Sequence, residues 1–497
     1  MSKLAMSKTF ATKSGVLLLF KPSSMKKICL LSCYLLFSAQ FLEAQEILVK
    51  PYLQPGNTST LAKEEKVLIW QTDSVAANYT VQASLQNFTN SGKLIKAKAS
   101  NVELKLKGKT TLLYRAGLKG LLFDTVYYYK VMLNEKTIAH DTFRTRTKKP
   151  FTRFVALGDF GAGTPQQSAI ATLIAKQKPQ FLVTTGDNVY SNGLEEEYRS
   201  NLFPYYLSPG PNRGAALMSK IPFYMVLGNH DVRADSIDKD PSTFAYFYYS
   251  DLPLNAPVTE RAVTIKGNSE LVKTFKKNTK PRFPGIANFS FDYGNVHMVC
   301  LDANDYVNPL DPLLVTWLRG DLGKSTADWK IVTFHAPGFN SSIAHYEYQL
   351  MRLLSPLFEE LGVNLVLTGH VHNYQRSVPL LFAPKTNEAG DRYLISPEGK
   401  VEGTFKLDTL YDGINKTKPE GIIYIVTGAG GAPLYDTRLS EKPALWKHEP
   451  TEKWPHFTKK LISDRHSFTL IETRGKTLTL QQIDLTGKVI DEIKVTR

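Results

Sequence analysis

Short apolar segments, most of them followed by a cluster of polar residues, recur between residues 150 and 430. Helix-like stretches at 168–178 and 348–361 separate some of these segments. Strands that alternate with helices predict a layered α/β fold, in which ligands bind beyond the carboxyl ends of the strands. The predicted strands are 154–157, 181–185, 223–227, 296–301, 330–334, 364–368 and 422–427.

Five of these strands end in residues that can bind metal ions. Carboxylate, amide, imidazole and phenolate groups are ligands for first-row metals, and a turn after each strand would direct them into one crevice. A single cluster could equally be an ordinary turn or a helix cap, but five in one domain supply about seven ligand side chains. The sequence therefore predicts a metal site, with glycines beside the ligands that allow sharp turns. The clusters are Gly158-Asp159-Phe160-Gly161, Gly186-Asp187-Asn188-Val189-Tyr190, Gly228-Asn229-His230-Asp231, Phe334-His335-Ala336-Pro337 and Gly369-His370-Val371-His372.

These clusters resemble the motifs of the calcineurin-like metallophosphoesterases and, within them, of the purple acid phosphatases. Tyr190, three residues after Asp187, is typical of the purple subgroup, which binds ferric iron through a tyrosine and owes its colour to that bond. The resemblance implies a centre of Fe³⁺ and a divalent ion, either Fe²⁺, Zn²⁺ or Mn²⁺, bridged by Asp187. It assigns Asp159, Asp187, Tyr190 and His372 to the ferric ion, and Asp187, Asn229, His335 and His370 to the divalent ion.

The resemblance further implies an acid phosphatase that hydrolyses small phosphate monoesters with a metal-activated hydroxide. His230 and His345 match family histidines and are the candidates for protonating the leaving group. Asp231 is expected to orient His230 rather than to bind metal. Two other interpretations stay open: a dinuclear-metal phosphodiesterase without the ferric ion, and a non-catalytic surface protein that binds through the same fold.

The 497 residues exceed one ordinary domain and predict two domains preceded by a leader. Residues 46–148 contain short runs of alternating apolar residues, at 66–70, 79–83, 126–131 and 142–145, which are typical of a β-sandwich. The resemblance implies that this domain is fibronectin type III-like. It also implies a catalytic domain at 151–497, with two mixed sheets in a sandwich flanked by helices. The long polar insertions at 235–282 and 380–420 are expected to be surface loops near the mouth of the site.

Residues 1–44 predict a signal peptide, with Met25 as a second candidate start. Met25-Lys26-Lys27 precedes an apolar run of about 14 residues, which is shorter than the roughly 20 needed to span a bilayer. A small-residue cleavage site follows at 42–45. We therefore expect an exported protein, periplasmic or extracellular, without a stable membrane span.

The formal charge of the chain is +15, and +10 remains after the leader, which carries six lysines and one glutamate. This charge is spread along the chain and no recognition helix accompanies it, so the expected partners are small phosphorylated substrates and not nucleic acids. Cleavage after Ala44 would leave Cys300 as the only cysteine, which excludes an internal disulfide. The sequence does not indicate an oligomeric state.

Overall fold

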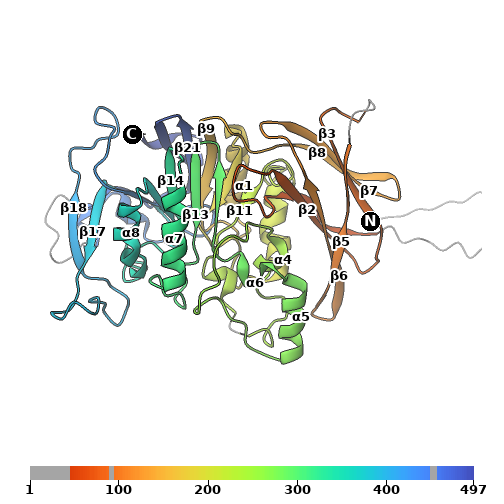
Figure 1. Cartoon of the computed structure of the whole chain (residues 1–497), viewed down its shortest axis with the longest axis horizontal. Helices are drawn as coiled ribbons and strands as arrows, with labels where there is room; N and C mark the ends of the chain where they lie inside the picture. Colours follow the sequence, from red (N-terminus) through yellow and green to blue (C-terminus); the bar gives the residue numbers. More distant parts are fainter. Residues whose placement is uncertain (1–44, 89–93, 235, 448–455) are drawn as a thin grey trace, which may run out of the picture. The chain divides into compact units, whose positions relative to one another are not determined.

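The computed structural model describes residues 45–88, 94–234, 236–447 and 456–497, which belong to one compact unit (Figure 1). The predicted signal peptide at 1–44 lies outside the described residues.

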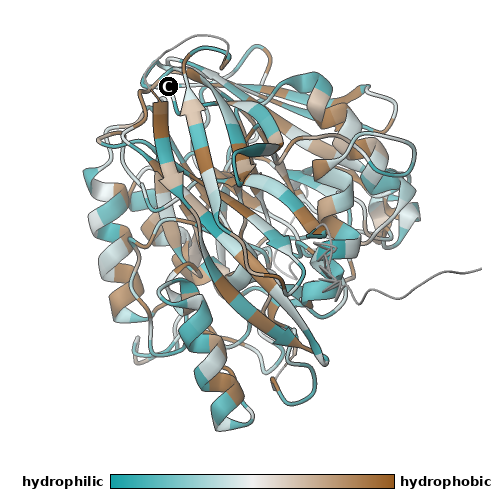
Figure 2. Cartoon of the chain, turned by 90° about the vertical axis from the view of Figure 1, so that its right-hand side faces the viewer, coloured by the Kyte–Doolittle hydropathy of each residue, from teal (hydrophilic) through white to brown (hydrophobic). Residues whose placement is uncertain are grey.

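Two antiparallel four-stranded sheets make up the first part of the described chain, with the orders β1-β2-β6-β5 and β4-β3-β7-β8. The two sheets share a core in which the Trp70 ring meets Tyr79 of the opposite sheet edge-on at 5.3 Å. Figure 2 shows the alternation of hydrophilic and hydrophobic residues along such strands, as a two-sheet packing requires. The strands are β1 (Ile47–Gln54), β2 (Glu65–Thr72), β3 (Tyr79–Ser84), β4 (Leu94–Lys98), β5 (Ser100–Leu106), β6 (Lys109–Lys119), β7 (Val126–Leu133) and β8 (Lys136–Arg144).

A six-stranded mixed sheet follows, with the order β11-β10-β9-β21-β22-β23 and with β9, β10 and β11 parallel. β11 covers only the first two residues of the strand predicted at 223–227. The chain leaves the ladder there because the Val226 N–H donates to the Thr184 hydroxyl at 2.8 Å. The strands are β9 (Phe151–Leu157), β10 (Phe181–Thr184), β11 (Phe223–Tyr224), β21 (Ser467–Arg474), β22 (Thr477–Asp484) and β23 (Val489–Thr496).

A seven-stranded mixed sheet packs against the six-stranded one, with the order β12-β13-β14-β15-β19-β16-β20 and a parallel centre from β13 to β19. Side chains alternate between its faces: Met298 joins the core shared by the two sheets, whereas Val299 packs with the helices outside. The strands are β12 (Phe289–Tyr293), β13 (Val296–Cys300), β14 (Trp329–Thr333), β15 (Leu365–Thr368), β16 (Tyr374–Ser377), β19 (Ile423–Thr427) and β20 (Thr458–Ile462). The prediction of two mixed sheets with helices on their outer faces is confirmed.

Helix starts follow ordinary capping chemistry. Thr164 caps α1 by accepting from the Gln167 N–H, and Asp311 caps α7, whose first residue is Pro312. Figure 1 shows α7 and α8 beside the seven-stranded sheet, where they contribute to its outer core. The helices are α1 (Pro165–Gln177), α2 (Glu195–Glu197), α3 (Phe203–Leu207), α4 (Tyr246–Tyr249), α5 (Ser269–Thr279), α6 (Arg282–Gly285), α7 (Pro312–Lys324) and α8 (Ser355–Glu360). None of the helices in the described ranges combines the length and the apolar character that crossing a bilayer demands.

Arg146, in the segment that connects β8 with β9, ties the first two sheets to the rest of the chain. Its side chain is buried, and its Nε donates to Glu64 Oε2 at 2.6 Å. Its guanidinium also donates to the carbonyl oxygens of Lys63 (2.7 Å) and Asp292 (3.2 Å), the latter in β12. The pairing with Glu64 and the carbonyls compensates the charge that burial would otherwise penalise.

A buried histidine joins β13 to its neighbours on both sides. His297 Nδ1 lies 2.7 Å from Asp292 Oδ1, and its Nε2 lies 2.9 Å from Asp321 Oδ2 in α7. Although burial opposes it, the two carboxylates raise the pKa of His297 to about 9.

The two insertions lie in different surroundings. The first contains α4 and α5, and Tyr249 of α4 accepts a 2.7 Å hydrogen bond from the Tyr52 hydroxyl in β1 at its carbonyl oxygen. That insertion therefore packs on the N-terminal sheets, and its expected place as a loop at the site mouth is wrong for the residues around α4. The second forms the hairpin β17 (Leu380–Pro384) and β18 (Gly403–Leu407).

Candidate metal centre

The loops after β9, β10 and β11 bring Asp159, Asp187, Tyr190 and Asn229 to one edge of the six-stranded sheet. The carboxylates are buried: Asp159 is 0% and Asp187 1% exposed. Both have positive φ, at 56° and 51°, a conformation that costs a non-glycine residue free energy and is found at functional sites.

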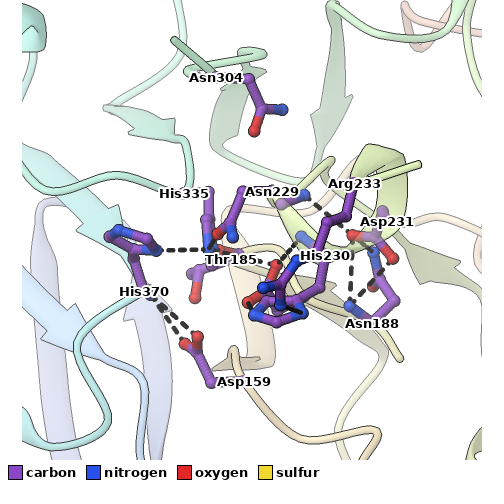
Figure 3. Close-up of polar contacts among 12 residues, drawn as sticks. Asp159, Thr185, Asn188, Asn229, His230, Asp231, Arg233, Asn304, His335 and His370 are labelled. Atoms are coloured by element: carbon purple, nitrogen blue, oxygen red, sulfur yellow. Dashed lines mark hydrogen bonds and ion pairs between the residues drawn. The ribbon is translucent and has the colours of Figure 1, made fainter. Parts of the chain in front are cut away.

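The loops after β14 and β15 bring three histidines to the facing edge of the seven-stranded sheet. His335 follows β14, and His370 and His372 follow β15, with His370 at φ 67°. Figure 3 shows His335 and His370 directed toward Asn229 and above Asp159. The packing of the two sheets therefore brings together all seven residues that the sequence predicted as metal ligands.

The glycines in the clusters serve mainly to leave space. A Cβ on Gly228 would lie 2.2 Å from Asp187 Oδ1, and one on Gly369 would lie 2.6 Å from Asp159 Oδ2. Of the glycines directly before a predicted ligand, Gly186 has a positive φ, of 93°. Gly228 and Gly369 do not have a positive φ, so the predicted reason, freedom to turn, does not apply to them. Glycine is needed there because another loop's carboxylate occupies the place of its side chain.

His335 lies at the centre of one group of acceptor atoms. Its Nδ1 is 2.7 Å from the Thr185 carbonyl oxygen, so Nδ1 carries the hydrogen and Nε2 presents a lone pair. Around Nε2 lie Asn229 Oδ1 at 3.0 Å, His370 Nδ1 at 3.1 Å and Asp187 Oδ1 at 3.3 Å. When the histidines are neutral, at most one of these four atoms carries a hydrogen, and that atom is His370 Nδ1. The oxygens of Asn229 and Asp187 therefore face the lone pair of His335 Nε2. Such a group attracts a cation.

His372 defines a second group beside the first. Its Nδ1 is 2.6 Å from the Pro433 carbonyl oxygen, which leaves Nε2 facing the site. That Nε2 lies 3.1 Å from the Tyr190 hydroxyl and 3.5 Å from Asp159 Oδ1. Asp187 lies between the two groups, because its carboxylate faces His335 and also interacts with the Tyr190 hydroxyl.

The pKa values follow the same electrostatics. Burial raises the pKa of Asp159 well above its usual range, and burial together with Asp159 raises the pKa of the Tyr190 phenol. Although burial opposes it, the Asp187 carboxylate raises the pKa of His335 to about 9. The protein groups by themselves therefore favour the uptake of positive charge at this site. The ligand atoms of Asp159, Asp187 and His335 lie within 4.8 Å of one another, and the set of carboxylates, imidazoles, amide and phenol suits first-row metal ions.

His230 lies beside this centre, and Asp231 lies behind it. His230 Nδ1 is 2.7 Å from the Ser191 carbonyl oxygen, and its Nε2 is 3.8 Å from Asp187 Oδ2. Asp231 does not orient His230, contrary to the prediction. It is fully buried, and its carboxylate accepts from the Gly228 N–H at 2.9 Å and from the Asn188 side chain at 2.8 Å. The 3-10 helix His230–Val232 turns consecutive side chains in different directions, so Asp231 stabilises the two ligand loops instead (Figure 3).

His345 lies over His370, with ring centroids 3.9 Å apart. Its Nε2 is 3.2 Å from the hydroxyl of Tyr435, whose ring stacks on His372 at 4.1 Å. Burial, and then the neighbouring His335, lower the pKa of His345. Tyr435 was not predicted from the sequence, although a glycine-rich run follows the strand β19, as glycines follow the other strands of the site.

A cavity of about 610 Å³ opens over the His335 group. The residues that line it include Asn229, Arg233, His335, His345 and His370. Two loops complete the wall: residues 303–307, which the buried Asp302 carboxylate organises by accepting from Asn304 and Tyr306, and residues 397–399 of the second insertion. The expectation that the second insertion reaches the site mouth is met by these three residues.

Residues 152–374 match the family model described as calcineurin-like phosphoesterase. This range is similar to calcineurin-like phosphoesterases and contains all seven residues that the sequence predicted as metal ligands. Within the class, the chain is similar to purple acid phosphatases, as the motifs predicted.

Two curated relatives from Arabidopsis thaliana document this similarity. Purple acid phosphatase 23 is 27% identical over 299 residues, which cover 53% of this chain and 57% of the relative. Purple acid phosphatase 17 is 30% identical over 233 residues, which cover 45% of this chain and 62% of the relative. The chain thus spans about three fifths of the length of these relatives.

The solved structure of purple acid phosphatase PPD1 from yellow lupin, Lupinus luteus, shares the fold. It aligns with a TM-score of 0.58 and 16% identity, covering 90% of this chain and 74% of that one. At this identity the likeness concerns the fold alone.

Proposed function

We propose that this protein is an acid phosphatase that hydrolyses phosphate monoesters at a dinuclear metal centre. Asp159, Asp187, Tyr190 and His372 would hold Fe³⁺, and Asp187, Asn229, His335 and His370 would hold Fe²⁺, Zn²⁺ or Mn²⁺. The observation that carries the proposal is the pair of adjacent acceptor groups around His335 and His372, joined by Asp187. The phenol, with two carboxylates, suits the harder trivalent ion, and the imidazoles with an amide suit the divalent one.

When bound, the two ions would supply a hydroxide nucleophile near neutral pH and neutralise the charge of the phosphoryl group. The chain's own residues orient the side chains that would bind these ions. The Thr185 and Pro433 carbonyls fix the tautomers of His335 and His372, so that both present Nε2 inward. Asp231 holds the loops that carry Asp187 and Asn229.

His230 and His345 are the proposed donors of a proton to the leaving group. The Ser191 carbonyl keeps the hydrogen on His230 Nδ1, so Nε2 is the nitrogen that faces the centre. His345 borders the cavity over His370. Because burial lowers the pKa of His345, its protonated form requires acidic solution. Hydrolysis should therefore be fastest below neutral pH.

The finer assignments of the domains belong to the same proposal. We propose a signal peptide at 1–44, a fibronectin type III-like domain at 46–148 and the catalytic domain at 151–497. The proposed location is the periplasm or the outside of the cell. The antiparallel two-sheet core around Trp70 supports the sandwich.

The test is a visible absorption spectrum with metal analysis of the purified protein. We expect about two metals per chain and a tyrosinate-to-iron band that disappears in Tyr190→Phe. Tyr348→Phe, at the rim of the same cavity, is the matched control and should keep the band. In His335→Ala the divalent ion and the hydrolysis of p-nitrophenyl phosphate should both be lost.

Other outcomes separate the alternatives. A colourless protein with two divalent ions would favour a phosphodiesterase of the same family. A protein that takes up no metal on reconstitution would refute the metal centre and favour a non-catalytic binding protein.

A further inference from the structure

We propose that Arg233 forms an anion-binding subsite beside the metal centre. It would select phosphate esters whose leaving group carries a second anionic group, either a phosphate or a carboxylate. This inference rests on the proposed function, because it names the substrate class of the same site.

Arg233 reaches the centre from a short distance along the chain. It follows the 3-10 helix His230–Val232 and lines the cavity together with Asn229 and His335. Figure 3 shows its side chain extending toward His230, where Nη1 lies 3.3 Å from Nδ1 of the imidazole. The guanidinium therefore lies beside Nδ1 of His230, whereas Nε2 is the nitrogen that faces Asp187.

The contact with His230 does not satisfy the guanidinium. Nδ1 of His230 is 2.7 Å from the Ser191 carbonyl oxygen and so carries a hydrogen, which leaves no lone pair for Arg233. Within the ranges that the structure describes, no carboxylate lies within 4.0 Å of this side chain. Arg233 thus presents a charged, forked donor to the cavity without an acceptor among the described residues.

The remaining wall explains why an anion would bind at Arg233 and not elsewhere. Arg233 is the only lysine or arginine among the described residues that line the cavity, whereas Asp305 and Glu398 carry negative charge there. Val307 and Met351 supply apolar surface. A substrate with its phosphoryl group at the metals would be repelled by the two carboxylates and attracted to the guanidinium. Arginine binds carboxylates and phosphates through two parallel hydrogen bonds, which suits both kinds of second anion.

The experiment compares matched substrates on the purified, metal-loaded enzyme. One pair is 3-phosphoglycerate and glycerol 3-phosphate, which differ by a carboxylate. The other is fructose 1,6-bisphosphate and fructose 6-phosphate, which differ by a phosphate. We expect kcat/KM to favour the doubly substituted member, and Arg233→Gln to lower that ratio by about tenfold or more. Arg233→Lys should keep part of the preference, and Glu398→Gln, which removes a negative charge from the same cavity, should increase it.

An unchanged ratio in Arg233→Gln would overturn the proposal. An equal loss for both members of a pair would also overturn it, because it would place Arg233 on the transferred phosphoryl group. A response of only one pair identifies the second anion as carboxylate or phosphate.

Calorimetric titration separates this proposal from the proposed function. The non-hydrolysable pair 2-carboxyethylphosphonate and propylphosphonate reports the subsite without turnover. If no ester is hydrolysed, the phosphatase assignment fails, and the subsite still stands or falls on whether Arg233→Gln abolishes the tighter binding of 2-carboxyethylphosphonate.

Discussion

The space left by Gly369 leads to the most specific prediction about the metal centre. A methyl group at this position would lie 2.6 Å from Asp159 Oδ2 and 2.7 Å from the Thr185 hydroxyl oxygen. Gly369 does not have a positive φ, so Gly369→Ala introduces a steric clash without backbone strain.

The size of the disturbance follows from these distances. Ordinary contacts of a Cβ begin near 3.4 Å, so the Asp159 carboxylate or the Gly369 loop must move by about 0.8 Å. Catalytic groups tolerate roughly 0.5 Å of displacement, and a shift of about 1 Å can cost on the order of 100-fold in rate. Overpacking of this kind costs about 1–3 kcal/mol of stability, which a folded protein of this size can lose without unfolding.

The assay combines metal analysis, kcat for p-nitrophenyl phosphate and thermal unfolding. We expect Gly369→Ala to lose about one metal ion per chain and on the order of 100-fold in kcat, while its melting temperature falls by only a few degrees. The matched control is Gly320→Ala in α7, where an added methyl meets no atom within 4 Å. This control should keep full metal content and gain about 0.5–1 kcal/mol from helix propensity.

Normal metal content and activity in Gly369→Ala would refute the reasoning. That result would mean that Asp159 is not held at the observed position or does not bind metal.

Two further predictions concern the framework around the site. Arg146→Met should lower the free energy of unfolding by about 3–5 kcal/mol in chemical unfolding, because it leaves the buried Glu64 with one cation fewer. The control Arg144→Met, at an exposed position of β8, should change the stability little. Equal effects of the two changes would contradict the role of Arg146. His297 has a pKa raised from 6.5 to about 9, so it should stabilise the fold by roughly 3 kcal/mol, fully below pH 6.5 and progressively less as the pH rises through 9. Urea unfolding of the wild type and His297→Gln at several pH values measures this difference, and a difference that grows toward pH 10 would show the sign to be wrong.

Much of the fold after residue 150 could be predicted from the sequence, because the signals for its strands are local. An apolar segment such as 330–334 is bounded by polar residues, and this pattern holds whatever the segment packs against. The length of the strand predicted at 223–227 was overestimated, because the end of this strand depends on a distant residue. Whether Val226 continues a ladder depends on the Thr184 hydroxyl, which lies 42 residues earlier in the chain.

The sequence by itself determined which residues stand at the strand ends: two aspartates, a tyrosine, an asparagine and three histidines, each within a short motif. These identities already predict a metal site, since ligand chemistry belongs to the side chain. Only the tertiary structure decided how they are presented. For His335 and His372, the nitrogen that faces inward depends on distant carbonyls: Thr185 is 150 residues from His335, and Pro433 is 61 residues from His372.

The same holds for residues whose role changed or was not foreseen. Asp231 turns away from His230, Gly369 leaves room for Asp159, and Arg233 lines the cavity without a carboxylate partner in the described chain. None of these follows from a motif, because each depends on the distance between loops that two packed sheets bring together from remote parts of the chain.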